Sequence, residues 1–214
     1  MSKIKQVEQS IKYLSCNIDV NKETDRQICK FLEYIARIAY NSNHLMTDLS
    51  YKDFIPSLLE RQHYGVFEHI IISFQVKTNR AIANELVRHR IASYLQASTR
   101  YIDLSQTPLE YIMPKTIMDD NILLFEESIL QSAITYNRLI ENGIKRQDAR
   151  DVLPLALATD IIMTLNLSSW MHFLTLRTSK KAHPLMVELA NMIKAKLIYL
   201  CPTIFNHPNC YNKI

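Results

Sequence analysis

Alternating hydrophobic and polar residues predict three strands. Residues 67–77 read FEHIIISFQVK, and their apolar positions Ile70, Ile72, Phe74 and Val76 recur at every second residue. Because successive side chains of a strand point to opposite faces, these four are expected to be buried together. The same pattern predicts strands over residues 158–165 and 11–20. On one side of the latter lie Leu14, Cys16, Ile18 and Val20.

Apolar residues spaced three or four apart predict helices elsewhere. Thr24 and Gln27 form a candidate capping box at the start of the first helix. Pro56 suits the first turn of the second, Ser168 is the predicted N-cap of the fifth, and Gly143 ends the longest one. The predicted helices cover residues 24–40, 54–63, 80–92, 120–142, 168–177 and 184–200.

The order of these elements predicts the fold class. Strands are mixed irregularly with helices, so we expect an α+β fold with a mostly antiparallel sheet flanked by helices. The 214 residues contain no internal repeat or Pro/Gly/Ser linker, and we expect a single domain over residues 1–214. Hydrophobic content of 48% with 21% charged residues excludes general disorder.

The cysteines and the apolar segments of the chain point to no special chemistry or location. The chain has four cysteines and no C-x-x-C pair. Cys201, His207 and Cys210 lie close in sequence without an evident fourth ligand, so no metal site is predicted. The N-terminus lacks the apolar region of a signal peptide, and no apolar run is long enough to cross a membrane. We expect a cytoplasmic protein with reduced thiols and no membrane partner.

The scarcity of glycine changes the picture. Gly65 and Gly143 are the two glycines of the chain, so neither a G-x-G-x-x-G loop nor a P-loop can form. Any bound phosphate must be held by side chains, and Arg suits this by its planar fork of donors. The stretch RHRIASYLQASTR, residues 88–100, concentrates such donors. By itself it is compatible with a solvated surface, a nucleic-acid patch or a cradle for a nucleotide.

Three sequence blocks resemble the flavin-dependent thymidylate synthases, the ThyX family. The segment RHRIASYLQASTRY resembles the signature R-H-R-x-x-S-x-N-E-x-S-x-R-Y, although Leu95 and Gln96 stand where Asn-Glu is usual. HYGVFEHIIISFQVK and ARDVLPLALATDIIMTLNLSSWMHFLTLR resemble two further family segments, in the family's order. Ser168, His172 and Lys181 depart from the common residues at their positions. The signature matches Arg88, His89, Arg90, Ser93, Ser98, Arg100 and Tyr101.

The resemblance implies an α+β homotetramer with active sites between subunits, which makes dTMP from dUMP. FAD is the implied cofactor, and NADPH and methylenetetrahydrofolate are the implied cosubstrates. Arg177 is the implied catalytic residue, at the uracil edge. The implied FAD contacts are His63, Gly65, Arg88, His89, Arg90, Gln96, Asn166, Leu167, Ser168 and His172. The implied dUMP contacts are Glu85, Arg88, Gln96, Ala97, Ser98, Thr99, Arg100, Arg150 and Arg177.

Two other functions remain open at this point. The change at Leu95 and Gln96 is compatible with a related flavin-dependent enzyme that methylates another uridine nucleotide. The basic segment is compatible with a non-enzymatic nucleic-acid-binding protein. Aromatic residues are not interleaved with its cations as in stacking platforms, so we expect no nucleic-acid partner.

Overall fold

The computed structural model describes residues 3–211, which form two compact units. Unit 1 comprises the described residues up to Ser10 together with Gln75–Arg90 and Tyr94–Ile162. Unit 2 comprises Ile11–Phe74, Ile91–Ser93 and the described residues from Met163 onward. That the whole chain is a single domain stays a prediction.

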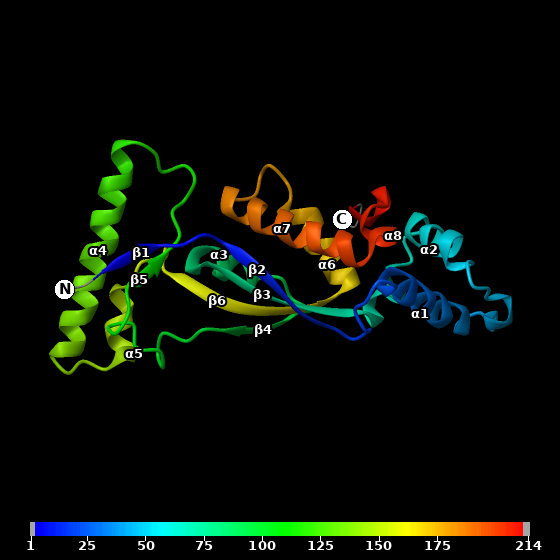
Figure 1. The fold of residues 1–214 in the computed structure, drawn as a ribbon, viewed down its shortest axis with the longest axis horizontal. Helices are drawn as coiled ribbons and strands as arrows, with labels where there is room; N and C mark the ends of the chain where they lie inside the picture. The colour runs from blue at the N-terminus through cyan, green and yellow to red at the C-terminus, as the bar shows by residue number, and fades with distance from the viewer. Residues whose placement is uncertain (1–2, 212–214) are drawn as a thin grey trace. The chain divides into compact units, whose positions relative to one another are not determined.

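Two sheets organise the chain (Figure 1). The larger has the strand order β2-β3-β6-β4, and its strands β3 and β6 supply residues to both units. These strands are β2 (Ser10–Cys16), β3 (Ile71–Asn79), β4 (Ser93–Gln96) and β6 (Ala158–Asn166). The smaller sheet pairs β1 (Ile4–Gln6) in parallel with β5 (Leu109–Tyr111).

Side-chain hydrogen bonds fix the direction of β3 against β6. Gln75 Nε2 donates to Asp160 Oδ1 at 2.9 Å, and the hydroxyls of Ser73 and Thr164 lie 2.8 Å apart. Residue numbers fall along β3 while they rise along β6, which is the register of an antiparallel pair. The α+β class with a mostly antiparallel sheet is therefore confirmed.

The predicted inner face of β3 is confirmed. Ile70, Ile72, Phe74 and Val76 are all fully buried. In unit 2, Trp170 Nε1 donates to the carbonyl oxygen of Ile72 at 3.2 Å, and the Trp170 ring meets Phe74 edge-on with centroids 5.3 Å apart. Trp170 belongs to helix α6 (Leu167–Arg177), and burial of its large ring in this geometry anchors the helix to the sheet.

In unit 1, helix α4 (Asp120–Glu141) packs on the β1–β5 pair (Figure 1). Its Ile129 and Ala133 join Leu109, Tyr111 and Leu157 in one buried cluster. Gly143, at φ +83°, follows α4, as the sequence predicts for a helix stop. The remaining helices of unit 1 are α3 (Arg80–Leu86), α5 (Arg146–Ala149) and the 3₁₀ helix η3 (Arg150–Val152).

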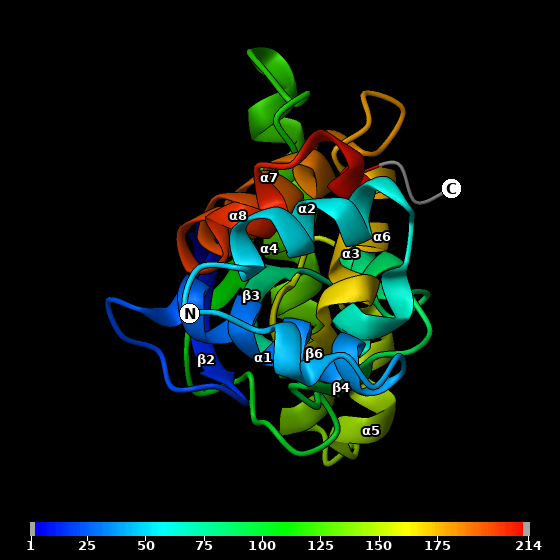
Figure 2. The same cartoon turned by 90° about the vertical axis from the view of Figure 1, so that its right-hand side faces the viewer.

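Unit 2 is mainly helical, and Figure 2 shows α1, α2 and α8 close to one another. Within it, the carboxylate of Asp25 on α1 accepts a hydrogen bond from the hydroxyl of Thr203 on α8 at 2.6 Å. The α-helices are α1 (Thr24–Ile38), α2 (Tyr51–Glu60), α6 (Leu167–Arg177), α7 (Pro184–Leu200) and α8 (Pro202–Phe205). The 3₁₀ helices are η1 (Asn43–Leu45), η2 (Tyr64–His69) and η4 (Pro208–Tyr211).

Two predicted helix caps are wrong. The N-cap of α1 is Glu23, and Thr24 instead exchanges two short hydrogen bonds with the backbone of Asn21. The N-cap of α6 is Asn166, whose Oδ1 accepts from the backbone N–H of Ser169 at 2.8 Å. At α6 the cap thus lies two residues earlier than predicted. At α1 no side chain caps the first turn, and the Asn21 side chain accepts from the backbone N–H of Glu23 instead.

Some predicted boundaries also shift. The first long strand ends at Cys16, and the side chains of Leu14 and Val20 are exposed. Helix α2 begins at Tyr51, so Pro56 lies inside it and its first turn is earlier than predicted. Tyr51 and Ile55 are buried on this helix, and their packing outweighs the hydrogen bond that proline removes.

Candidate functional site

The Arg88–Arg90 segment follows α3 as a turn, although the sequence predicts helix through residue 92. Helix α3 ends at Leu86, and the hydroxyl of Tyr94 shares its hydrogen between the carbonyl oxygens of Leu86 and His89, at 2.8 and 2.9 Å. These bonds satisfy acceptors that the helix end leaves free. His89 is 8% exposed, while the side chains of Arg88 and Arg90 are exposed. The two guanidiniums are thus available to anionic ligands.

Ile91 makes the turn from this segment into β4. Its φ of +62° lies in the left-handed region, which a β-branched residue rarely adopts. Its side chain is 79% exposed, so burial does not compensate for the strain. Strain of this kind costs about 1–3 kcal/mol and tends to occur at functional sites.

Residues beyond β4 form the predicted substrate loop. The backbone N–H of Ala97 donates to the Asp160 carbonyl oxygen at 2.9 Å, which fixes the end of β4 to β6. Ser98 Oγ accepts from the backbone N–H of Arg100 at 3.3 Å, and Thr99 is buried. Gln96 Nε2 donates to Thr159 Oγ1 at 3.3 Å. Five predicted dUMP contacts, residues 96–100, are therefore held in one ordered segment of unit 1.

A cavity of about 260 Å³ in unit 1 brings two of the predicted substrate residues together. Thr99 and Arg150 both line it, and so does Arg80, which sequence reasoning missed. The other dUMP contacts predicted in unit 1 lie outside this lining. Its remaining residues are Asp151, Leu153, Pro154, Leu155 and Leu157.

Arg80 carries an unsatisfied donor in this cavity. Its Nη1 atom is buried and has no hydrogen-bond partner within residues 3–211. Burial lowers the pKa of Arg80, and the positive charge of Arg150 lowers it further. The backbone N–H of Arg80 donates to the Leu157 carbonyl oxygen at 3.0 Å, which fixes the start of α3 to the cavity wall. A half-buried guanidinium with an unsatisfied N–H and a second cation nearby favours an anion in the cavity.

Arg150 is positioned by its own short helix. Its Nε donates to the carbonyl oxygen of Gln147 at 3.0 Å, and the carboxylate of the exposed Asp151 lies 3.9 Å from the same atom. An exposed pair at that distance neutralises little charge. The cavity therefore keeps a positive character that suits a phosphate.

Glu85 lies on α3 in unit 1, and the remaining predicted residues lie in unit 2. A recess of about 220 Å³ is lined by Asn166 and by seven other residues, among them Glu68, Ile91 and Ser93. Asn166 is placed there by its two roles, as the last residue of β6 and the cap of α6. Of the FAD contacts predicted in unit 2, Asn166 is the one that lines the recess.

The other predicted residues of unit 2 differ in exposure. His63, Gly65 and His172 are exposed, whereas Leu167 and Ser168 are buried. Arg177 is half-buried in the last turn of α6, where the helix dipole favours a cation. Their roles stay predictions.

Residues 3–211 contain neither a cluster suited to a metal ion nor a membrane-spanning helix. No group of three or more His, Cys, Asp and Glu side chains in this range is arranged to hold a metal ion. None of the helices described there is long and apolar enough to cross a membrane.

Comparison with known proteins gives consistent matches. Residues 20–203 match the family described as thymidylate synthase complementing protein. The flavin-dependent thymidylate synthase of Geobacter sulfurreducens is 33% identical over 190 residues, covering 82% of this chain and 80% of that protein. The protein of that name from Kosmotoga olearia is 34% identical over 189 residues, covering 79% and 80%.

The fold has a solved counterpart. A crystal structure of the UMP/dUMP methylase PolB from Streptomyces cacaoi, bound with 5-Br dUMP, superposes with a TM-score of 0.82. It covers 99% of both chains at 19% sequence identity. This likeness concerns the fold, which agrees with the α+β arrangement expected from the sequence.

Proposed function

The chain belongs to the flavin-dependent thymidylate synthase family, and from this premise we propose that it converts dUMP to dTMP by reductive methylation. Methylenetetrahydrofolate supplies the one-carbon unit, and NADPH supplies reducing equivalents through FAD. No observation favours the two alternatives, methylation of another uridine nucleotide and binding of nucleic acid.

The cavity with Arg80, Thr99 and Arg150 is the observation that carries the substrate assignment. The phosphate of dUMP can accept a hydrogen bond from the guanidinium of Arg80, which lines the cavity. The phosphate also relieves the repulsion between Arg80 and Arg150. The hydroxyl of Thr99 can donate a further hydrogen bond to it. The substrate phosphate thus places negative charge and acceptor oxygens beside the two guanidiniums.

The other substrate contacts are proposed from the resemblance. Arg177 lies at the uracil edge and stabilises the negative charge that develops as the C5 carbon becomes nucleophilic. Arg suits this role because it stays protonated. The rest of the nucleotide is proposed to contact Glu85, Arg88, Gln96, Ala97, Ser98 and Arg100.

The donor set fits FAD, which supplies hydride transfer when bound. The exposed guanidiniums of Arg88 and Arg90 suit a diphosphate in a chain without a glycine-rich loop. In unit 2, the recess at Asn166 offers amide and carboxylate groups of the kind that hydrogen-bond a flavin ring edge. His63, Gly65, His89, Gln96, Leu167, Ser168 and His172 complete the proposed cofactor contacts.

The cellular setting is also proposed. The four cysteines are free thiols, which supports a reducing compartment such as the cytoplasm.

The resemblance supports a homotetramer, and light scattering of the purified protein would give its mass.

The visible absorption spectrum of the purified protein tests the proposal. We expect flavin bands near about 450 nm, a property of the cofactor itself, and faster oxidation of NADPH when dUMP is added. A protein that stays colourless and inert with excess FAD would refute the proposed function. Steep salt-dependent binding to oligonucleotides by such a protein would support the nucleic-acid alternative.

A further inference from the structure

Arg146, on the short helix α5, binds the loop that follows β4. Its Nη1 donates to the carbonyl oxygen of Tyr101 at 3.1 Å, and its Nη2 donates to Asp103 Oδ2 at 3.0 Å. One planar guanidinium thus ties two positions of the loop to α5, and we call these two bonds the Arg146 clamp. Arg146 is not among the proposed FAD or dUMP contacts, so the proposed chemistry does not account for the clamp.

The loop side of the clamp continues directly into the wall of the substrate cavity. The backbone N–H groups of Tyr101 and Ile102 both donate to the Ser98 carbonyl oxygen, at 3.1 and 3.0 Å. Thr99 lies inside the turn that these bonds close, and its buried side chain lines the cavity. By holding the Tyr101 carbonyl group, Arg146 therefore fixes the turn that contains Thr99.

The helix side of the clamp leads to the second wall residue. Arg150 follows Arg146 by four residues, and its backbone N–H donates to the carbonyl oxygen of Arg146. The guanidinium of Arg150 lines the same cavity as Thr99. Arg146 is thus linked through its side chain to the turn of Thr99 and through its backbone to Arg150.

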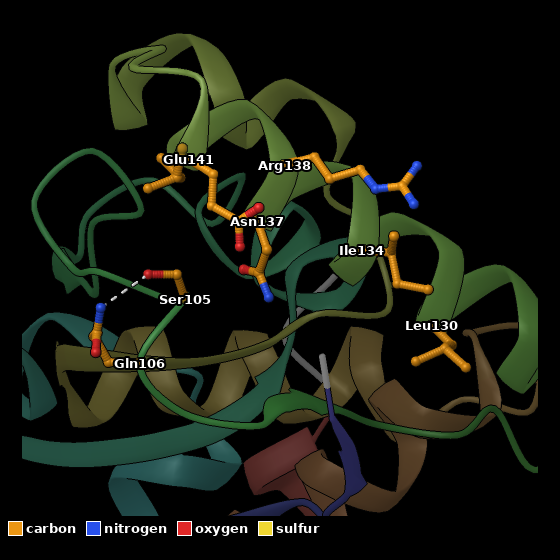
Figure 3. A pocket seen from close by; sticks show the side chains of 8 residues that line it. Ser105, Gln106, Leu130, Ile134, Asn137, Arg138 and Glu141 are labelled. Atoms are coloured by element: carbon orange, nitrogen blue, oxygen red, sulfur yellow. Dashed lines mark hydrogen bonds between the residues drawn. The ribbon is translucent and has the colours of Figure 1, made fainter. Parts of the chain in front are cut away.

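The carboxylate of the clamp is held in place by Ser105. Asp103 Oδ1 accepts from the hydroxyl and the backbone N–H of Ser105, at 2.6 and 3.0 Å. These bonds, and then the charge of Arg146, lower the pKa of Asp103, so this residue is ionised at neutral pH. Ser105 itself faces a groove of about 730 Å³ that shares no lining residue with the substrate cavity (Figure 3). The side chains of Arg146 and Asp103 are 44% and 24% exposed, and so exposed a pair alone would stabilise little. Its effect is therefore expected in local geometry more than in overall stability.

We propose that Arg146 is a positioning residue for the substrate phosphate, and that the clamp joins Thr99 and Arg150 into one phosphate-binding unit. Arg146 acts through these two residues and does not touch the nucleotide. Without the clamp, the phosphate has to order the turn and the helix as it binds, and this ordering weakens binding. The inference rests on the proposed function, because the phosphate is that of dUMP.

Arg146→Met tests the proposal in the FAD-loaded protein, since it removes both hydrogen bonds but keeps an unbranched side chain. We expect the dissociation constant for dUMP, measured by titration calorimetry, to rise about tenfold. The turnover number at saturating dUMP should stay within about twofold of wild type, because only ground-state binding is weakened. Arg146→Lys, which keeps the charge without the fork, should lie between the two. Arg138→Met is the matched control, because Arg138 is exposed on α4 and extends away from Ser105 in Figure 3.

Asp103→Asn breaks the clamp from its other side. The asparagine oxygen can still accept from Ser105, while its NH₂ group opposes the guanidinium of Arg146. This variant should show the same rise in the dissociation constant with an unchanged turnover number. Circular dichroism confirms folding, and Asp103→Asn decides the question if Arg146→Met does not fold.

A double-mutant cycle with Thr99→Val separates positioning from a general loss of structure. If Arg146 acts through Thr99, the double variant R146M/T99V should bind dUMP about as weakly as the weaker single variant. Losses that multiply would overturn the inference, as would wild-type affinity in the folded clamp variants or a turnover number that falls as far as the affinity. A wild-type protein that does not bind dUMP would refute the proposed function, and this inference with it.

Discussion

Arg80 and Arg150 line one cavity, where burial and then the charge of Arg150 lower the pKa of the Arg80 guanidinium. One of its nitrogens, Nη1, is buried without a hydrogen-bond partner within residues 3–211. Two cations on one cavity wall repel each other, which favours an anionic ligand. In the proposed account, the phosphate of dUMP supplies the negative charge that this arrangement favours.

Arg80→Met is expected to change two properties in opposite directions. The free energy of unfolding of the ligand-free protein should rise by roughly 1 kcal/mol, because a buried unsatisfied donor is removed. The dissociation constant for dUMP should rise roughly tenfold to a hundredfold, because a charge-assisted hydrogen bond is lost. Thermal unfolding and titration calorimetry measure the two effects. Arg61→Met, at the exposed end of α2, is the control, and dUMP binding of wild-type strength by Arg80→Met would contradict the phosphate assignment.

Arg177→Ala is expected to lower the turnover number about a hundredfold or more while the protein stays folded. The reason is the loss of a cation that stabilises charge on the activated uracil. Steady-state formation of dTMP measures the effect, and Arg177→Lys, which keeps the charge but not the planar fork, should retain part of the activity. Near-normal turnover by the alanine variant would show that the uracil edge is held by another residue.

Much of the fold is encoded in the local sequence pattern, and the strands that the pattern misses depend on a partner distant in sequence. The alternation from Ile70 to Val76 predicts the buried face of β3 because one face of this strand is covered. Helix α4 is predicted within a residue at each end because Gly143 stops it. The three-residue strands β1 and β5 have no periodic signal of their own, since a parallel partner distant in sequence creates them.

The candidate site was only partly predictable for a similar reason. The motif residues Thr99 and Arg150 could be named from the resemblance, but not that they share a cavity. Arg80 has no motif to mark it. Its position directly after the buried cap Asn79, at the junction of a strand and a helix, is the signal that could have found it.

Replacing all four cysteines by Ser or Ala should leave dTMP formation within about tenfold of wild type. Burial raises the pKa of the Cys210 thiol to about 12 and raises that of Cys16, Cys29 and Cys201 as well, so none is primed to act as a thiolate near neutral pH. Each lost packing contact costs roughly 1 kcal/mol of stability. A folded cysteine-free variant that binds FAD and dUMP without making dTMP would indicate a thiol nucleophile.

Ile91→Gly should stabilise the protein by about 1 kcal/mol, a small net gain. Glycine removes the left-handed strain at φ +62°, and its greater freedom in the unfolded chain offsets part of that gain. Chemical denaturation measures the change. Ala92→Gly is the matched control, because Ala92 lacks a positive φ and should lose stability. A loss of stability in both variants would show that the Ile91 side chain contributes packing that outweighs the strain.

The central claim is that this chain methylates dUMP with a flavin. Its most direct test incubates the purified protein with FAD, NADPH, dUMP and methylenetetrahydrofolate carrying a ¹³C-labelled methylene group, and analyses the nucleotide by mass spectrometry. We predict dTMP with the label in its methyl group, formed in amounts that depend on NADPH. Unchanged dUMP from a folded, flavin-loaded protein would contradict the account.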